Sequence, residues 1–144
     1  MKRARLLMVF GIALTAGVVR AQVWYEDGDA PALLPAQITV GDGPLTAITG
    51  TLTSGSDADL YAIYIDDEAA FSATTVGGTS IDSALYLFDA SGNGVAMSED
   101  SQGTQSTITS TFVVSNGLYY LAMSAYDYDP LNPGGLEIWN DTPW

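Results

Sequence analysis

The stretch TITSTFVVSNGLYYLAMSAY, residues 107–126, decides the fold class of this 144-residue chain. Two runs rich in β-branched and aromatic residues, 107–115 and 118–126, flank Asn116-Gly117, a pair that suits a tight hairpin turn. Apolar residues alternate within each run and so share one face, as do Ile108, Phe112 and Val114 in the first and Tyr119, Leu121 and Met123 in the second. The stretch predicts two antiparallel strands joined by a turn.

Further runs of this kind follow from residue 45 onward, separated by turns of Gly, Ser, Asn and Asp. They cover residues 46–53, 60–65, 70–76, 84–88, 94–98 and 136–139. Outside the first 20 residues no window shows sustained helical periodicity. About eight antiparallel strands at intervals of roughly 8–12 residues predict an all-β sandwich or jelly roll. Its expected core includes several tyrosines together with Phe71, Leu85, Leu87, Phe112 and Leu121.

The first 21 residues have the layout of a secretory signal peptide. All four basic residues lie within the first 20 positions, and residues 6–19 form an uncharged, mostly apolar run. Val19 and Ala21 put small side chains at positions −3 and −1 of a cut before Gln22. We expect residues 1–21 to form a signal-peptide helix that is removed on export, so that the protein is secreted, periplasmic or on the cell surface. The alternative is an uncleaved anchor, although the run is shorter than the ~20 residues of a spanning helix.

Beyond the leader, the chain divides into an acidic extended lead-in, residues 22–43, and a β-sandwich domain, residues 44–144. The lead-in holds two of the six prolines, and we expect only a short helical turn or strand in it, near residues 36–40. A Pro- and Gly-rich stretch, residues 130–135, comes shortly before Trp144. A further strand or a sorting tail beyond Trp144 is left as an open alternative.

The composition excludes several classes of function. The chain has 17 Asp and Glu, four Lys and Arg, no His and no Cys, and its net charge is −13 at pH 7. It therefore has no Ser-His-Asp or Cys-His nucleophile, no His or Cys ligand for zinc or haem, and no disulfide. An acidic chain does not attract nucleic-acid phosphates or anionic lipid, so we expect no nucleic-acid partner. No stretch beyond the leader is long and apolar enough to cross a bilayer, so we expect no membrane span after leader removal.

Cleavage before Gln22 would leave all 17 acids and no Lys or Arg. Clustered carboxylates would then have to lie apart in water, cap backbone N–H groups, take up protons or bind a metal ion. Two acidic groups are candidates for a shared site: Glu26, Asp27 and Asp29 in the lead-in, and Asp57 and Asp59 before a strand. Calcium takes about six to eight oxygen ligands, which carboxylates and backbone carbonyls supply. From spacing alone, solvated turn acids, with Asp57 or Asp59 as a cap, are the open alternative.

The chain from residue 26 to 126 resembles the bacterial pre-peptidase C-terminal domain. The matching pieces are an acidic lead and five further motifs, in the order 26–29, 48–52, 57–61, 82–89, 98–100 and 116–121. The resemblance implies a secreted, generally non-catalytic β-sandwich, some of whose relatives bind calcium and collagen or other polymers. It carries the role of calcium ligand to Glu26, Asp29, Asp57 and Asp59, with Asp27 as a further candidate. No protease domain precedes the module here, which favours an accessory or binding protein acting alone.

Exposed aromatic residues offer a second kind of site. Tyr126, Tyr128 and Trp139 are candidate ligand-binding residues that could stack on sugar rings or dock an extracellular polymer or protein. The alternative is that they pack loop ends onto the sandwich. No GxSxG, HExxH or P-loop pattern occurs, and no single carboxylate pair stands out, so we predict no catalytic activity, with a carboxylate-pair hydrolase as the remaining alternative. Asp89–Gly94 matches only part of a calcium loop and is better explained as a β-turn.

Overall fold

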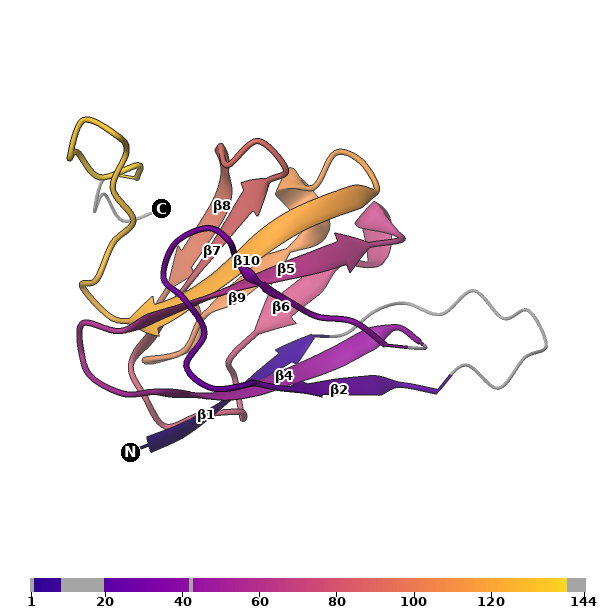
Figure 1. Cartoon of the computed structure of the whole chain (residues 1–144), viewed down its shortest axis with the longest axis horizontal. Helices are drawn as coiled ribbons and strands as arrows, with labels where there is room; N and C mark the ends of the chain where they lie inside the picture. The colour runs from indigo at the N-terminus through magenta and orange to yellow at the C-terminus, as the bar shows by residue number, and fades with distance from the viewer. Residues whose placement is uncertain (1, 9–19, 42, 140–144) are drawn as a thin grey trace.

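Two five-stranded sheets pack face to face in the computed structural model, which describes residues 2–8, 20–41 and 43–139, the first of these ranges by backbone alone (Figure 1). The first sheet has the order β2 (Gln22–Tyr25), β4 (Leu45–Leu52), β1 (Lys2–Met8), β6 (Ser72–Thr74) and β9 (Thr107–Thr109). The second has the order β3 (Gln37–Ile38), β5 (Ala58–Ile65), β10 (Gly117–Ala125), β7 (Ser83–Asp89) and β8 (Gly94–Glu99). The all-β sandwich prediction is confirmed.

The core lies between the sheets and follows the alternation that the sequence showed. Leu85 and Leu87 on β7 and Leu121 on β10 are fully buried, and Leu121 is the backbone partner of Leu87. Residues from the first sheet and its loops close the core from the other side, among them Ile48, Phe71, Ala73 and Ile108. Successive side chains of a strand point to opposite faces, so this pattern leaves the alternate residues of β7 and β10 on the outer face.

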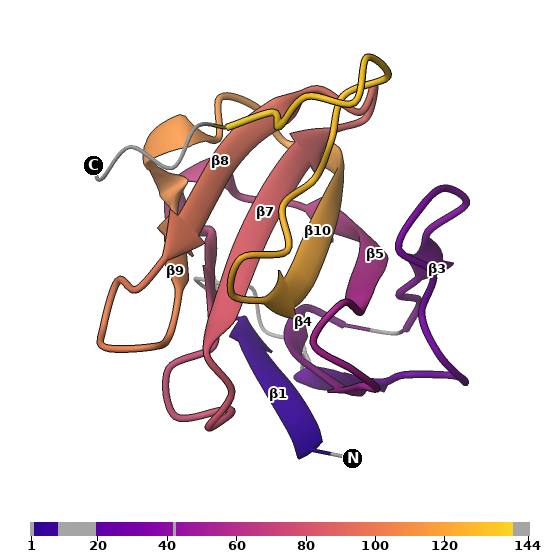
Figure 2. The same ribbon diagram turned by 90° about the vertical axis from the view of Figure 1, so that its left-hand side faces the viewer.

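The C-terminal segment covers part of that outer face. It crosses over β10, β7 and β8 after the chain leaves the sheet (Figure 2). Trp139 packs on Tyr86 and Phe88, with ring centroids 5.6 and 5.5 Å apart. A second, smaller cluster of Leu60, Ala84, Tyr86 and Phe88 is therefore buried on the side of the sheet that faces away from the main core.

Three expectations about the strands are corrected. The run 107–115 leaves the sheet after Thr109 and enters a 3-10 turn, Ser110–Phe112. This turn places Val113 in the core and leaves Phe112, a predicted core residue, 57 % exposed. The run 70–76 is shortened in the same way, since a 3-10 turn, Glu68–Ala70, precedes β6. Residues 136–139 form no strand; among the described residues their β-pairing is limited to an isolated bridge between Leu131 and Glu137.

The lead-in is more ordered than expected and makes the sandwich partly parallel. Its strand β2 runs parallel to β4, and the two-residue β3 runs parallel to β5. The lead-in therefore places one strand on the edge of each sheet, β2 on the first and β3 on the second. The lead-in spans one open side of the sandwich.

The predicted leader contributes a strand in its described part. Residues 2–8 form β1, which pairs antiparallel with both β4 and β6, with Leu6 opposite Ile48 and Met8 opposite Ala73. Residues 9–19, which hold most of the predicted signal-peptide helix, lie outside the described residues, so the helix and its cleavage stay predictions. Among the described residues, no helix has the length and apolar character needed to cross a bilayer.

Candidate metal centre

The lead-in brings its acids to the start of β5. After β2, the Glu26 N–H donates to the Thr49 carbonyl at 2.9 Å, which keeps the chain beside β4. The chain then turns at Gly28, whose φ of +74° lies in the region that glycine adopts without strain. The Leu60 N–H donates to the Pro31 carbonyl at 3.0 Å, which fastens the next part of the lead-in to β5.

Three carboxylates meet where the lead-in passes β5. Glu26, Asp29 and Asp59 each present a carboxylate oxygen within 4.8 Å of those of the other two. Asp59 is buried, Glu26 is half-buried and Asp29 is exposed, so the group opens to solvent on the side of the lead-in. Two oxygens bound to one calcium ion at ~2.4 Å can lie at most about twice that distance apart. The spacing of this carboxylate group suits a single ion.

Glu26 is held rigidly by hydrogen bonds to both of its oxygens. The Ala30 N–H donates to Oε1 at 3.0 Å, and the Thr51 N–H donates to Oε2 at 2.8 Å. The Tyr61 hydroxyl lies 3.2 Å from Glu26 Oε1 and 3.3 Å from Asp59 Oδ2. A hydroxyl has one proton to donate, so Tyr61 can serve only one of the two carboxylates at a time.

Of the three carboxylates, that of Asp59 has the fewest hydrogen-bond partners for its buried oxygens. It is 3 % exposed, and its Oδ1 has no hydrogen-bond partner among the described residues. Its pKa is raised from 3.8 to about 8, first by burial and then by the negative charges of Glu26 and Asp57. Burial also raises the pKa of the Tyr61 hydroxyl, with a further contribution from the charge of Asp59. An unpartnered, buried carboxylate beside two others needs either a proton or a cation.

A glycine makes room for this arrangement. Gly50 lies on β4, and a Cβ at this position would stand 2.8 Å from both Glu26 Oε2 and the Tyr61 hydroxyl oxygen. Real Cβ atoms essentially never approach that closely, so any larger residue would displace the hydrogen-bonded Glu26–Tyr61 pair. Sequence reasoning identified neither Gly50 nor Tyr61 as part of the site, although both lie within the motifs 48–52 and 57–61.

The other two predicted ligands lie outside the carboxylate group. Asp57 Oδ2 accepts hydrogen bonds from the Thr53 N–H and, at 2.8 Å, from the Thr53 hydroxyl, so it closes a local turn. It still acts on the site through its charge, which helps to raise the pKa of Asp59. Asp27 is exposed, and its N–H and carbonyl bond to the Gln37 side chain at 3.0 and 3.1 Å. The structure thus brings together three of the five acids named from the sequence.

The remaining acidic loop behaves as a turn. The Asp89 Oδ1 accepts the N–H groups of Ser91 and Asn93 at 2.8 and 2.9 Å, and hydrogen bonds to Asn93 lower the Asp89 pKa. Its carboxylate is used in shaping the β7–β8 connection.

The predicted aromatic ligand-binding residues do not share one platform. Trp139 is half-buried against Tyr86 and Phe88, as the packing alternative expects. Tyr128 lines a cavity on the outer face of the second sheet, whereas Tyr126 is exposed and is not part of that cavity. The three residues therefore serve different places on the surface.

Comparisons of the chain with models of known protein families, with curated proteins and with solved structures returned no match. The resemblance to the pre-peptidase C-terminal domain stays a prediction.

Proposed function

We propose that this protein is an exported, non-catalytic β-sandwich module, similar to the pre-peptidase C-terminal domain, whose lead-in is clamped by one calcium ion. The observation that carries the calcium proposal is the buried Asp59 Oδ1, which has no partner among the described residues and belongs to a group of three converging carboxylates. Export rests on the leader-like first 21 residues, and the accessory role rests on the family resemblance.

Calcium is the cation that this set of ligands favours. The carboxylate group offers only oxygen atoms, which hard cations prefer, and the chain has no His or Cys to recruit a softer metal. Calcium accepts an irregular shell of about six to eight oxygens and keeps waters, so the exposed side at Asp29 can remain hydrated. Magnesium requires near-ideal octahedral geometry, for which the fixed orientation of Glu26 leaves less freedom.

The ion would act as a clamp between two parts of the fold. Glu26 and Asp29 belong to the lead-in, whereas Asp59 belongs to β5 in the second sheet. Because the unfolded chain has no preformed site, the free energy of binding adds to the stability of the folded state. A hundredfold excess of calcium over its dissociation constant would contribute ~2.7 kcal/mol.

Thermal melts of the full chain in calcium and in chelator test this proposal. We expect calcium to raise the Tm of the wild type, and Asp29→Asn to reduce that increase without unfolding the protein, because Asp29 is exposed. Asp27→Asn is the matched control. It removes the same charge at a position two residues before Asp29, where the side chain lies outside the carboxylate group. Equal Tm values in calcium and chelator, or equal losses in both variants, would overturn the clamp.

A further inference from the structure

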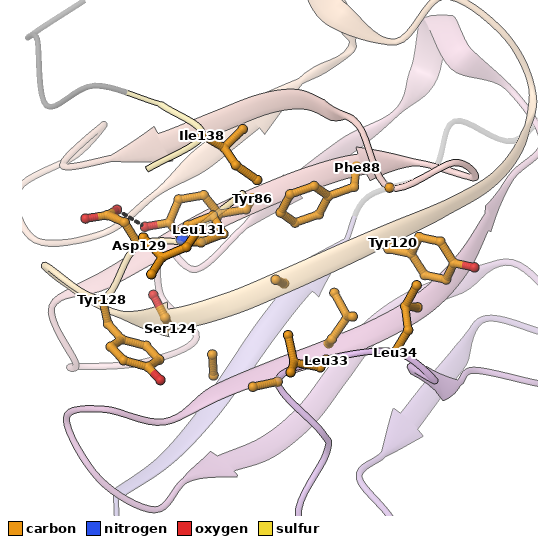
Figure 3. A pocket seen from close by; sticks show the side chains of 16 residues that line it. Leu33, Leu34, Tyr86, Phe88, Tyr120, Ser124, Tyr128, Asp129, Leu131 and Ile138 are labelled. Atoms are coloured by element: carbon orange, nitrogen blue, oxygen red, sulfur yellow. Dashed lines mark hydrogen bonds between the residues drawn. The ribbon is translucent and has the colours of Figure 1, made fainter. Parts of the chain in front are cut away.

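A cavity of about 470 Å³ lies on the outer face of the second sheet (Figure 3), and its lining includes none of the three residues of the carboxylate group. Its floor comes from β5, β7 and β10, through residues such as Leu60, Phe88 and Ala122. The lead-in forms one rim with residues 32–34, and the C-terminal segment forms the other with residues 128–131 and Ile138. The volume falls within the range of about 300–1,000 Å³ that is typical of small-molecule sites.

The rims expose large apolar side chains that the fold alone does not require. Leu33 is 78 % exposed, Leu34 is 58 % exposed and Leu131 is 59 % exposed, and all three border this cavity. Scattered exposed leucines are common on protein surfaces, but several that surround one hollow mark a binding site. The cavity thus offers an apolar slot to the body of a ligand.

At the end of the cavity near Tyr86, Ser124 and Asp129, the polar groups can only accept hydrogen bonds from a ligand. The Tyr86 hydroxyl donates to Asp129 Oδ1 at 2.6 Å (Figure 3). The Ser124 hydroxyl donates to the Ala125 carbonyl at 2.9 Å. Both protons are therefore used within the protein, and the Asp129 carboxylate can only accept. Glu99 Oε1, 3.3 Å from the same Tyr86 hydroxyl, adds a second negative group.

The charge at this end selects the ligand. None of the residues that line the cavity is basic, so nothing there would pair with an anionic headgroup. The hydroxyls of Tyr120 and Tyr128 can donate or accept and impose no preference. A headgroup that carries N–H donors and a positive charge complements Asp129, because hydrogen bonds between charged groups are about twice as strong as neutral ones.

We propose that this cavity binds a small amphiphilic amine, with its apolar body between Leu34 and Phe88 and its ammonium group on the Asp129 carboxylate. This second site lies on the other side of β5 from the main core, and none of the three carboxylates of the calcium clamp lines it. The apolar walls supply most of the binding energy, and Asp129 distinguishes amines from alcohols and acids with the same chain.

Calorimetric titration of the full chain with decylammonium, decanol and decanoate, each below its micellar concentration, tests the proposal. We expect saturable binding at one site, tightest for decylammonium and weakest for decanoate. Asp129→Asn should weaken decylammonium about tenfold or more and leave decanol unchanged, since the amide still accepts the Tyr86 hydroxyl but carries no charge. Leu34→Ser should weaken both ligands.

The acidic surface of the protein requires a control for unspecific attraction. Asp127→Asn removes an exposed charge two residues from Asp129 and outside the cavity lining, and it should leave all three titrations unchanged. The proposal is overturned if Asp127→Asn weakens decylammonium as much as Asp129→Asn does. It is also overturned if the three probes bind alike, or if none shows saturable binding.

Discussion

Replacing Asp59 by asparagine should have opposite effects on stability without calcium and with it. The pKa of Asp59 is about 8 in the folded protein, against an ordinary value of 3.8. At pH 7 the calcium-free protein must therefore take up a proton when it folds, because the unfolded chain holds Asp59 ionised. Each pH unit between the ordinary pKa of 3.8 and pH 7 lowers the free energy of unfolding by about 1.4 kcal/mol, which gives a total of roughly 4 kcal/mol.

The side chain introduced by Asp59→Asn would need no proton, and its amide N–H groups could donate to the carboxylates of Glu26 and Asp29 beside it. If half of the cost is recovered, the calcium-free variant gains about 2 kcal/mol, or about 8 °C in Tm for a domain of this size. With calcium, the same variant lacks the central buried ligand and should show little or no rise in Tm.

Differential scanning calorimetry of wild type and Asp59→Asn, each in chelator and in calcium, measures both effects. We expect the variant to be the more stable protein in chelator and to lose the calcium response of the wild type. The reasoning is refuted if Asp59→Asn lowers the Tm in chelator, or if it keeps the wild-type response to calcium.

Three further results are expected. Gly50→Ala should lower the free energy of unfolding by about 1–3 kcal/mol and weaken calcium binding, because its Cβ would displace Glu26 and Tyr61. Gly55→Ala, which has open space around it, should do neither. Urea unfolding and calcium titration compare the two variants. In chelator, the wild type should lose stability relative to Asp59→Asn as the pH rises from about 4 to 8. Because the pKa of Asp59 is higher in the folded than in the unfolded chain, its stabilising effect is complete at pH values below the unfolded-state pKa and is lost as the pH rises to the folded-state pKa. A pH series of melts in which the two proteins differ by a constant amount would contradict this. A chain that begins at Gln22 lacks β1 and leaves β4 and β6 without their shared partner. Its Tm should therefore be lower than that of the full chain and should rise again when a peptide of residues 1–8 is added. Equal Tm values for the shortened and the full chain would speak against the pairing.

Alternation in the sequence predicted the strands that pair along most of their length. Residues 84–88 and 118–126 became β7 and β10 because each pairs with a neighbouring strand along both of its edges. The run 107–115 has the same composition, but within the described part of the chain it pairs only with the three-residue β6, so pairing ends at Thr109. Composition reports what suits a pleated surface, whereas the length of a strand depends on the partner available.

The candidate site was predictable in part for a similar reason. The convergence of Glu26, Asp29 and Asp59 follows from two acidic segments that the family resemblance relates. Asp57 differs because Thr53, four residues earlier, offers it two nearby donors, and a local turn captures the side chain. Tyr61 fits the alternation of a core residue, and indeed it is buried, but its hydroxyl also reaches the carboxylate group. The apolar cavity depends on the path of the C-terminal segment, which has no periodic pattern to read.

Diffraction from crystals grown in calcium tests the central claim most directly. The clamp predicts one strong density peak among the carboxylate oxygens of Glu26, Asp29 and Asp59, with calcium–oxygen distances of ~2.3–2.6 Å and Asp59 Oδ1 among the ligands. Crystals in which Asp59 Oδ1 remains without an ion, and in which calcium lies elsewhere or nowhere on the chain, would contradict it.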